Sequence, residues 1–155
     1  MASVDDLWLT DFGLARQTSV ESGVTERGQV LGAPPYMPPE QALGHIEKVD
    51  RRSDVYSLGA TLHHLLTGRP PFIAATVLQT LAQVVQDEPV PPRRLNDNIP
   101  RDLENICLKC LNKSPDDRYQ TADEFGQDLD RFLRGVPTLA RPLSPWERAY
   151  RFCRR

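Results

Sequence analysis

The chain has 155 residues, 39% of them hydrophobic, which is enough to build one folded domain and excludes disorder throughout. Its 19 basic and 21 acidic side chains give a formal charge of −2, which excludes the broad positive surface expected of a nucleic-acid-binding protein. Three cysteines and an N-terminus without a basic and apolar leader favour a cytoplasmic protein. The apolar runs are too short to predict a membrane span.

The first elements expected are a short strand and a long loop. Residues 4–10 contain a Leu-Trp-Leu run that stops at Thr10, a pattern typical of a strand that leads into a turn. Asp11 would then lie at the strand end. Residues 14–32 are polar and lack any sustained period, so they predict a long loop. Four prolines between positions 34 and 39 exclude regular structure as far as Glu40.

The clearest helix is predicted over residues 54–66. Ser53 is the expected N-cap, and Gly68 has the position of a C′ residue that ends a helix. Between them the apolar side chains recur at helical spacing, at Val55, Leu58, Leu62, Leu65 and Leu66. We therefore expect this helix to form the centre of the core.

Three further helices are expected after it. The second covers about residues 74–86, with an apolar face of Val77, Leu78, Leu81, Val84 and Val85. The third begins after Pro100, and its apolar stripe consists of Leu103, Ile106, Cys107, Cys110 and Leu111. The fourth opens with Thr121 and Glu124 in capping-box spacing and ends before Gly135. It is expected to bury Ala122, Phe125, Leu129, Phe132 and Leu133.

Short motifs follow one another in a fixed order along this pattern. They are Asp11-Phe12-Gly13, then Gly32-Ala33-Pro34-Pro35-Tyr36-Met37-Pro38-Pro39-Glu40-Gln41, then Asp54-Val55-Tyr56-Ser57-Leu58-Gly59, and finally Arg118. Each motif alone is weak, but their order over about residues 5–133 resembles the second half of the bacterial eukaryotic-like serine/threonine protein kinases, of planctomycete type.

This resemblance implies a mainly α, partial protein-kinase-like fold. Its parts would be a helical C-lobe, a short N-terminal strand and a long activation-type loop. Residues 1–134 would form the partial kinase domain, and residues 135–155 a basic, juxtamembrane-like tail.

The resemblance also implies a cofactor site. In the family the Asp of Asp-Phe-Gly binds the Mg²⁺ that bridges the phosphates of ATP, so Asp11 would be the metal ligand. Phe12 and Gly13 would set the direction of its carboxylate. The loop that follows resembles an activation loop, whose candidate phosphorylation sites are Thr18, Ser19, Ser22 and Thr25.

A substrate shelf is implied at Gly32, Ala33, Pro34, Pro35 and Tyr36. The family normally has threonine where this chain has Ala33, a departure that weakens the expectation of efficient catalysis. Glu40 would form a buried ion pair with Arg118, whose disruption would cost several kcal/mol. Asp54 would hold the backbone of the catalytic loop.

Several kinase motifs are absent from these 155 residues: the Gly-rich loop, the strand lysine with its helix glutamate, and the His-Arg-Asp segment. We therefore expect a chain that is inactive alone. The alternative is a docking module for a protein substrate or for a separate N-terminal kinase half. A misassigned start of an intact kinase is a third, weaker hypothesis. In these 155 residues alone, an apolar face of the 54–66 helix would lack the cover that the rest of a kinase domain provides, which predicts aggregation or dimerisation unless a partner covers it.

Some residues have a structural and a functional interpretation. Cys107 and Cys110 have C-x-x-C spacing but lie on an apolar helix stripe without a second ligand pair, which favours packing over zinc or redox chemistry. His63 and His64 are assigned to helix packing or its surface.

The last fifteen residues, 141–155, hold five arginines and one glutamate, a local charge of +4, with Trp146, Tyr150 and Phe152. They fit a membrane-surface segment, as in membrane-anchored relatives, or a solvated charged helix.

Overall fold

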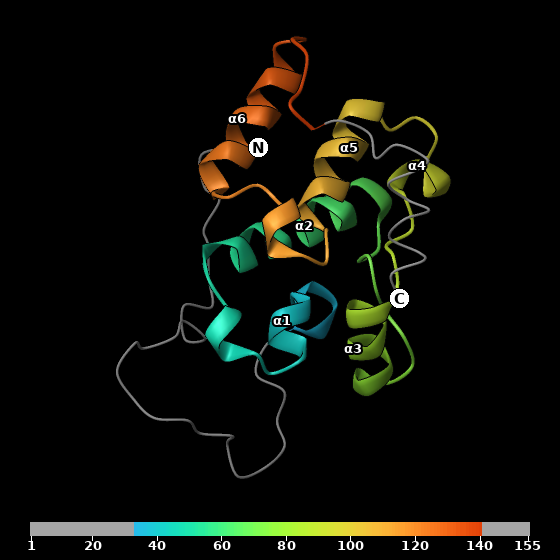
Figure 1. Ribbon diagram of the computed structural model, residues 1–155. Coiled ribbons are helices and arrows are strands. Elements are labelled where there is room, and N and C mark those ends of the chain that lie inside the picture. The colour runs from blue at the N-terminus through green and yellow to red at the C-terminus, as the bar shows by residue number, and fades with distance from the viewer. Residues whose placement is uncertain (1–32, 141–155) are drawn as a thin grey trace, which may run out of the picture. The chain divides into compact units, whose positions relative to one another are not determined.

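The structure is a computed structural model that describes residues 33–140. Three predictions therefore lie outside the described residues: the strand over residues 4–10, the activation-type loop and the basic tail. The described part is helical and contains no strand. Its α-helices are α1 (Pro39–Ala42), α2 (Arg51–Thr67), α3 (Val77–Gln86), α4 (Pro92–Leu95), α5 (Arg101–Cys110) and α6 (Ala122–Leu133) (Figure 1). Short 3₁₀ turns are η2 (Pro34–Tyr36), η3 (Ile46–Lys48) and η4 (Pro115–Asp117).

Helix α2 begins earlier than expected, because Asp50 rather than Ser53 is its N-cap. The Asp50 carboxylate accepts a hydrogen bond of 2.8 Å from the backbone N–H of Arg52, which satisfies one of the free donors of the first turn. Ser53 lies inside the helix and is buried. At the other end Gly68 has φ of 77°, so the prediction that this glycine ends the helix is confirmed.

The other predicted helices are also present, with small shifts at their ends. Helix α3 begins at Val77, three residues later than expected, because the Thr76 hydroxyl caps it by accepting a hydrogen bond from the N–H of Gln79. Thr121 caps α6 as predicted, with its hydroxyl 3.1 Å from the N–H of Glu124. The Glu124 carboxylate bonds back to the N–H of Gln120, one residue before the cap.

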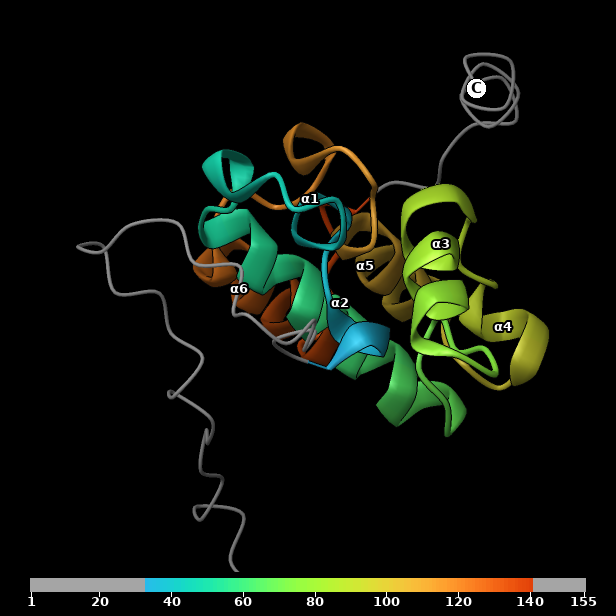
Figure 2. The same cartoon turned by 90° about the horizontal axis from the view of Figure 1, so that it is seen from below.

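The core lies where α2, α5 and α6 meet. In Figures 1 and 2, α2 passes through the middle of the described helices, with α6 on one side and α3 and α4 on the other. One cluster joins the three central helices and consists of Val55, Ile106, Cys110, Tyr119, Phe125 and Ala140. A second joins α2 and α5 and consists of Tyr56, Ala60, Cys107 and Leu111. Helix α2 is therefore the centre of the core, as the sequence predicts.

Not every apolar residue on the predicted stripes is buried. On α2, Leu58 is 37% exposed and Leu65 is 79% exposed. Val77 and Leu78 at the start of α3 are exposed as well. The prediction that α6 buries Ala122 and Leu133 is wrong, since both side chains are exposed. Among residues 33–140, no helix combines the length and the apolar character that a membrane span requires.

Candidate functional site

The structure describes part of the predicted site. Ala33, the η2 turn, Glu40, Asp54 and Arg118 lie within residues 33–140. Gly32, the Asp-Phe-Gly motif with Asp11, Phe12 and Gly13, and the candidate phosphorylation sites Thr18, Ser19, Ser22 and Thr25 lie outside the described residues. The described part of the predicted site is the turn Pro34–Tyr36, called the shelf turn after the predicted substrate shelf, with the residues that hold it on the helices.

Prolines shape the shelf turn and the chain that follows it. Pro34 and Pro35 lie in the η2 turn, which the N–H of Met37 closes by donating to the carbonyl of Pro34. Pro38 is extended, with φ of −74° and ψ of 154°, and Pro39 is the first residue of α1. Proline suits this first helical position, because no hydrogen-bond partner is available there for an N–H group. The turn thus passes directly into the short helix that carries Glu40.

Glu40 and Arg118 form a buried, two-pronged ion pair. Nη1 of Arg118 lies 2.8 Å from Oε1 of Glu40, and Nη2 lies 2.9 Å from Oε2. The Arg118 side chain is 0% exposed and the Glu40 side chain is 5% exposed. Ser53 of α2 donates a third hydrogen bond of 2.7 Å to Oε1. Charge-assisted bonds in this parallel geometry are both strong and specific in direction, so α1 has a fixed position against α2.

All five N–H donors of Arg118 have acceptors. Nε donates to the carbonyl of Asn112, one Nη1 proton to the carbonyl of Arg52, and one Nη2 proton to the carbonyl of Lys113. The other two protons go to Glu40. The guanidinium therefore joins α1, the start of α2 and the α5–α6 connection at one point. A lysine has only three donors and cannot make this set of bonds.

The pKa of Glu40 follows from this environment. Burial acts to raise the pKa, but the hydrogen bonds from Arg118 and Ser53 favour the charged form and outweigh it. The net result is a pKa below the usual value of 4.5. Glu40 is therefore ionised at neutral pH, and the pair is a true ion pair.

Tyr36, the last residue of the shelf turn, is held on α2 by its backbone and its side chain. Its carbonyl accepts a hydrogen bond of 3.0 Å from the hydroxyl of Ser57. Its own hydroxyl lies 2.5 Å from Nδ1 of His64, and the two rings are stacked with an interplanar angle of 21°. Together with Thr61 and Leu65 these rings line an open depression of about 310 Å³.

The histidines of α2 differ in their surroundings. His63 is buried and its two ring nitrogens contact the carbonyls of Arg69 and Val90, so it packs between α2 and its neighbours. His64 contacts the shelf turn instead, a link that sequence reasoning missed. No local signal indicates it, because its partner lies 28 residues away.

Asp54 lies on the exposed side of α2, one turn before the partly exposed Leu58. Within the part of the chain that the structure describes, its carboxylate makes no hydrogen bond or ion pair. An acidic and an apolar side chain are thus presented on the same helix face.

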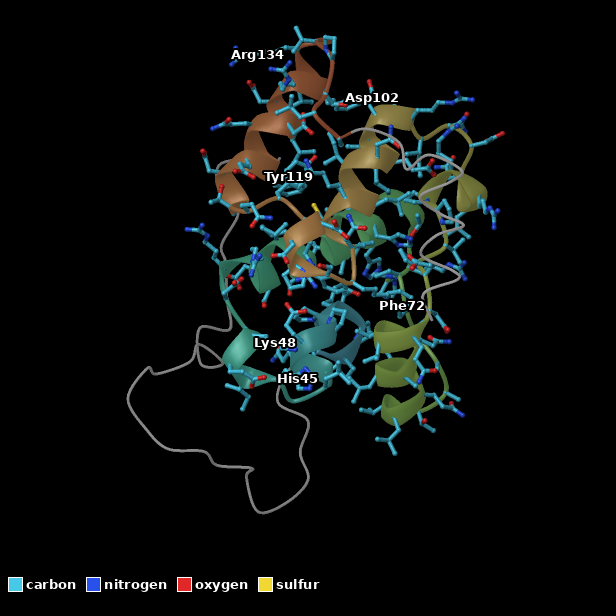
Figure 3. The ribbon with its side chains drawn as sticks, viewed as in Figure 1. His45, Lys48, Phe72, Asp102, Tyr119 and Arg134 are labelled. Carbon is cyan, nitrogen blue, oxygen red and sulfur yellow. The ribbon has the colours of Figure 1, made fainter. Side chains whose placement is uncertain are left out.

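A buried carboxylate that the sequence did not reveal lies at the other end of the core. Asp128 of α6 is 0% exposed and accepts three hydrogen bonds: 2.6 Å from the Tyr119 hydroxyl, 2.6 Å from the N–H of Leu139 and 2.9 Å from the N–H of Ala140. Tyr119 belongs to the cluster between α5 and α6 (Figure 3). Residues 139 and 140 are therefore fixed to the helical core.

The two helical cysteines are packing residues. Cys107 and Cys110 are free thiols buried in α5, and burial raises the pKa of Cys107 to about 12 and raises that of Cys110 as well. Among residues 33–140, no group of three histidine, cysteine or acidic side chains is placed to hold a metal ion. Both thiols therefore pack in the core of the described residues, at the contact between α2 and α5.

Comparison with known proteins identifies the family. The protein kinase domain family matches residues 1–128. Serine/threonine-protein kinase PknB of Mycobacterium leprae is 45% identical over 127 residues, which are 82% of this chain and 20% of that protein. PknB of Mycolicibacterium smegmatis is 44% identical over 140 residues, 89% of this chain and 22% of that protein. A probable serine/threonine-protein kinase of Streptomyces coelicolor is 43% identical over 129 residues, 82% of this chain and 19% of that protein.

The chain spans about a fifth of the length of these relatives. The matched region includes the shelf turn, α1, α2 and Arg118, whose contacts are described above. The chain therefore belongs to the protein kinase domain family, among the bacterial serine/threonine kinases.

Proposed function

We propose that the chain forms the substrate-binding part of a serine/threonine protein kinase, which transfers the γ-phosphoryl group of ATP to serine or threonine of a protein. The observation that carries this proposal is the buried pair of Glu40 and Arg118. It fixes the shelf turn, Pro34–Tyr36, on the helical core. A rigid shelf is what phosphoryl transfer needs, because the reaction depends on positioning and on electrostatic stabilisation.

The cofactors proposed are ATP and Mg²⁺. Asp11 would hold the metal through a carboxylate oxygen, the type of ligand that Mg²⁺ prefers. Mg²⁺ would neutralise charge on the transferred phosphoryl group. Phe12 and Gly13 would set the direction of the Asp11 side chain. The threonine and serine residues between positions 18 and 25 remain the proposed phosphorylation sites.

These 155 residues alone are proposed to be inactive, because the sequence contains no His-Arg-Asp segment and no Gly-rich loop. The exposed side of α2 that carries Asp54 and Leu58 is the surface proposed for the remainder of the catalytic domain. It offers an apolar contact beside a carboxylate that can accept backbone N–H bonds. We also propose that the chain is located in the cytoplasm, because its sequence has few cysteines.

The test is transfer from labelled ATP with Mg²⁺ to a generic basic protein, with Asp11→Ala as the control. The chain alone should give no signal above this control. A mixture with a polypeptide that supplies the N-terminal part of a related kinase domain should give a signal that Asp11→Ala abolishes. Phosphoryl transfer by the chain alone, lost in Asp11→Ala, would contradict the proposed inactivity.

A docking module without catalysis is the second candidate, favoured by the same exposed face of α2. A Leu58→Ser variant should then lose binding to the N-terminal part or to a protein substrate, while Leu78→Ser on α3 serves as an exposed control. If binding persists in both variants, the α2 face is not the docking surface.

Membrane proximity through the basic tail is a separate proposal. It rests on the five arginines and three aromatic residues of residues 141–155. Sedimentation with vesicles of anionic lipid tests it, since binding should fall with added salt and should be absent with neutral lipid.

A further inference from the structure

The depression beside the shelf turn has a defined chemical character. Its lining consists of Tyr36, Thr61, His64 and Leu65, which are a phenol, a hydroxyl, an imidazole and an apolar side chain. None of the four carries a carboxylate, so the lining offers no anion that would form an ion pair with a lysine or arginine of a bound peptide. Leu65 is 79% exposed and provides an apolar contact for the stem of a longer side chain.

The contact between Tyr36 and His64 determines which ring nitrogen is available. A phenol is a better proton donor than a neutral imidazole N–H, and the imidazole nitrogen is the stronger base. At 2.5 Å the Tyr36 hydroxyl therefore donates to Nδ1 of His64. In the neutral ring the remaining proton is then on Nε2, which presents a donor.

The donor is held in place. The ring stack with Tyr36 fixes the plane of the imidazole, and the Ser57 hydroxyl fixes the backbone of Tyr36. Thr61 uses its own proton for the carbonyl of Ser57, so its hydroxyl oxygen offers an acceptor but no second donor. Within the described residues Nε2 of His64 has no hydrogen-bond partner. The depression thus holds one oriented, unused donor.

We infer that His64, oriented by Tyr36, selects an acidic side chain of the protein substrate close to its phosphoacceptor residue. This inference rests on the proposed function, because the shelf turn must be the place where a substrate lies. A carboxylate is the ligand that fits, since hydrogen bonds to an ionised acceptor are stronger than neutral ones. A substrate lysine would meet the Nε2 donor and find no carboxylate partner in the lining.

The test uses peptide binding without ATP, so that it does not depend on catalysis. Peptides with one threonine and a single Glu, Gln or Lys moved through the neighbouring positions are measured by fluorescence anisotropy against the whole chain. At one position the Glu peptide should bind about tenfold more tightly than the Lys peptide. His64→Glu should reverse this order, and His64→Leu should abolish it.

His45→Glu is the matched control, because it makes the same change of charge outside the depression, on the loop after α1 (Figure 3). Its peptide preference should equal that of the unmodified chain. An unchanged preference in His64→Glu, a preference for Lys in the unmodified chain or an absence of peptide binding overturns the inference. If the acidic preference is found but the assembled kinase transfers no phosphoryl group, the proposed function fails, and only the preference of the depression for an acidic peptide stands.

Discussion

Gly59 of α2 lies directly against Cys110 of α5, so closely that a Cβ atom at position 59 would overlap the Cβ atom of Cys110. Its carbonyl also accepts a hydrogen bond of 3.6 Å from the thiol of Cys107. The missing side chain therefore allows the two central helices to approach at this point. The backbone of α5 sets the position of the Cys110 Cβ atom, so this atom can move aside only if the helix itself moves.

Gly59→Ala should consequently destabilise the chain by about 1–3 kcal/mol, the usual cost of overpacking a core. Gly126→Ala is the matched control, because this glycine also lies inside a helix but has nothing within 4 Å of an added Cβ. The control should stabilise by about 0.5–1 kcal/mol through helix propensity. Urea unfolding measures both changes, and a Gly59→Ala variant that is as stable as the Gly126→Ala variant would contradict the close approach.

The ion pair of Glu40 and Arg118 predicts a large effect of single substitutions. Arg118→Met should cost about 3–5 kcal/mol, because it leaves the Glu40 carboxylate buried and without its partner. The double variant Glu40→Leu with Arg118→Met should be less destabilised than the sum of the single variants. The exposed pair of Asp130 and Arg134, 2.9 Å apart, provides the control. Arg134→Ala should change stability by no more than about 0.5 kcal/mol.

The lowered pKa of Glu40 predicts an acid-sensitive stability. A group whose pKa is lower in the folded state stabilises the fold above its unfolded pKa, and this contribution is lost as the pH falls through the folded value. Glu40 should therefore contribute fully above about pH 4.5 and progressively less below it. Unfolding free energies at several pH values should fall more steeply in acid for the unmodified chain than for Glu40→Gln. Asp50, whose pKa is also lowered, acts in the same direction in both proteins and cancels in the comparison.

Asp128 predicts that the folded body includes residues 139 and 140. Asp128→Ala should destabilise by about 2–4 kcal/mol, because it leaves the Tyr119 hydroxyl and two backbone N–H groups without partners. Hydrogen exchange at Leu139 and Ala140 should become faster. The exposed neighbour Gln127 is the control, and Gln127→Ala should leave both amides protected. A truncated chain that ends at residue 134 should be less stable than the full chain. An equal free energy of unfolding would show that residues 139 and 140 are not part of the folded body.

The buried thiols predict resistance to modification. The third cysteine of the sequence, Cys153, is first replaced by serine so that only the two buried thiols are measured. Cys107 and Cys110 should then not react with a disulfide reagent at pH 8 until the chain unfolds, because burial raises the pKa of both thiols and shields them. Reagent absorbance with and without denaturant measures this. Rapid modification of the folded chain would show that the α2–α5 contact opens readily.

Local signals account for the helices that the sequence predicted. Thr121, Gly68 and the regular spacing of apolar residues act within one or two turns, and α2, α3, α5 and α6 appear where these signals lie. The error at the start of α2 arises because Asp50 and Ser53 both suit a cap. The choice between them depends on Glu40, which binds the Ser53 hydroxyl from outside the helix.

Local sequence patterns do not predict contacts between residues that are far apart in the sequence. Periodicity identifies the apolar stripe of α2 but not which part of it a neighbour covers, so the exposure of Leu65 was not foreseen. The partners of Asp128 lie up to 12 residues away, and the partner of His64 lies 28 residues away. The contact between Glu40 and Arg118 was expected only through the family pattern, because no short-range rule connects them.

The long separation of that pair also bears on the order of folding. Glu40 and Arg118 are 78 residues apart, so their contact closes most of the described chain into one loop. The entropy of such a closure is lost before the contact contributes energy, and contacts of this kind slow folding. The shelf turn is thus expected to reach its final position late, after α5 and the connection to α6 have formed. The shelf turn is then correctly placed only when the whole helical body has folded. Partial unfolding near residues 112–118 would break the contact of Arg118 with Glu40 and release the shelf turn.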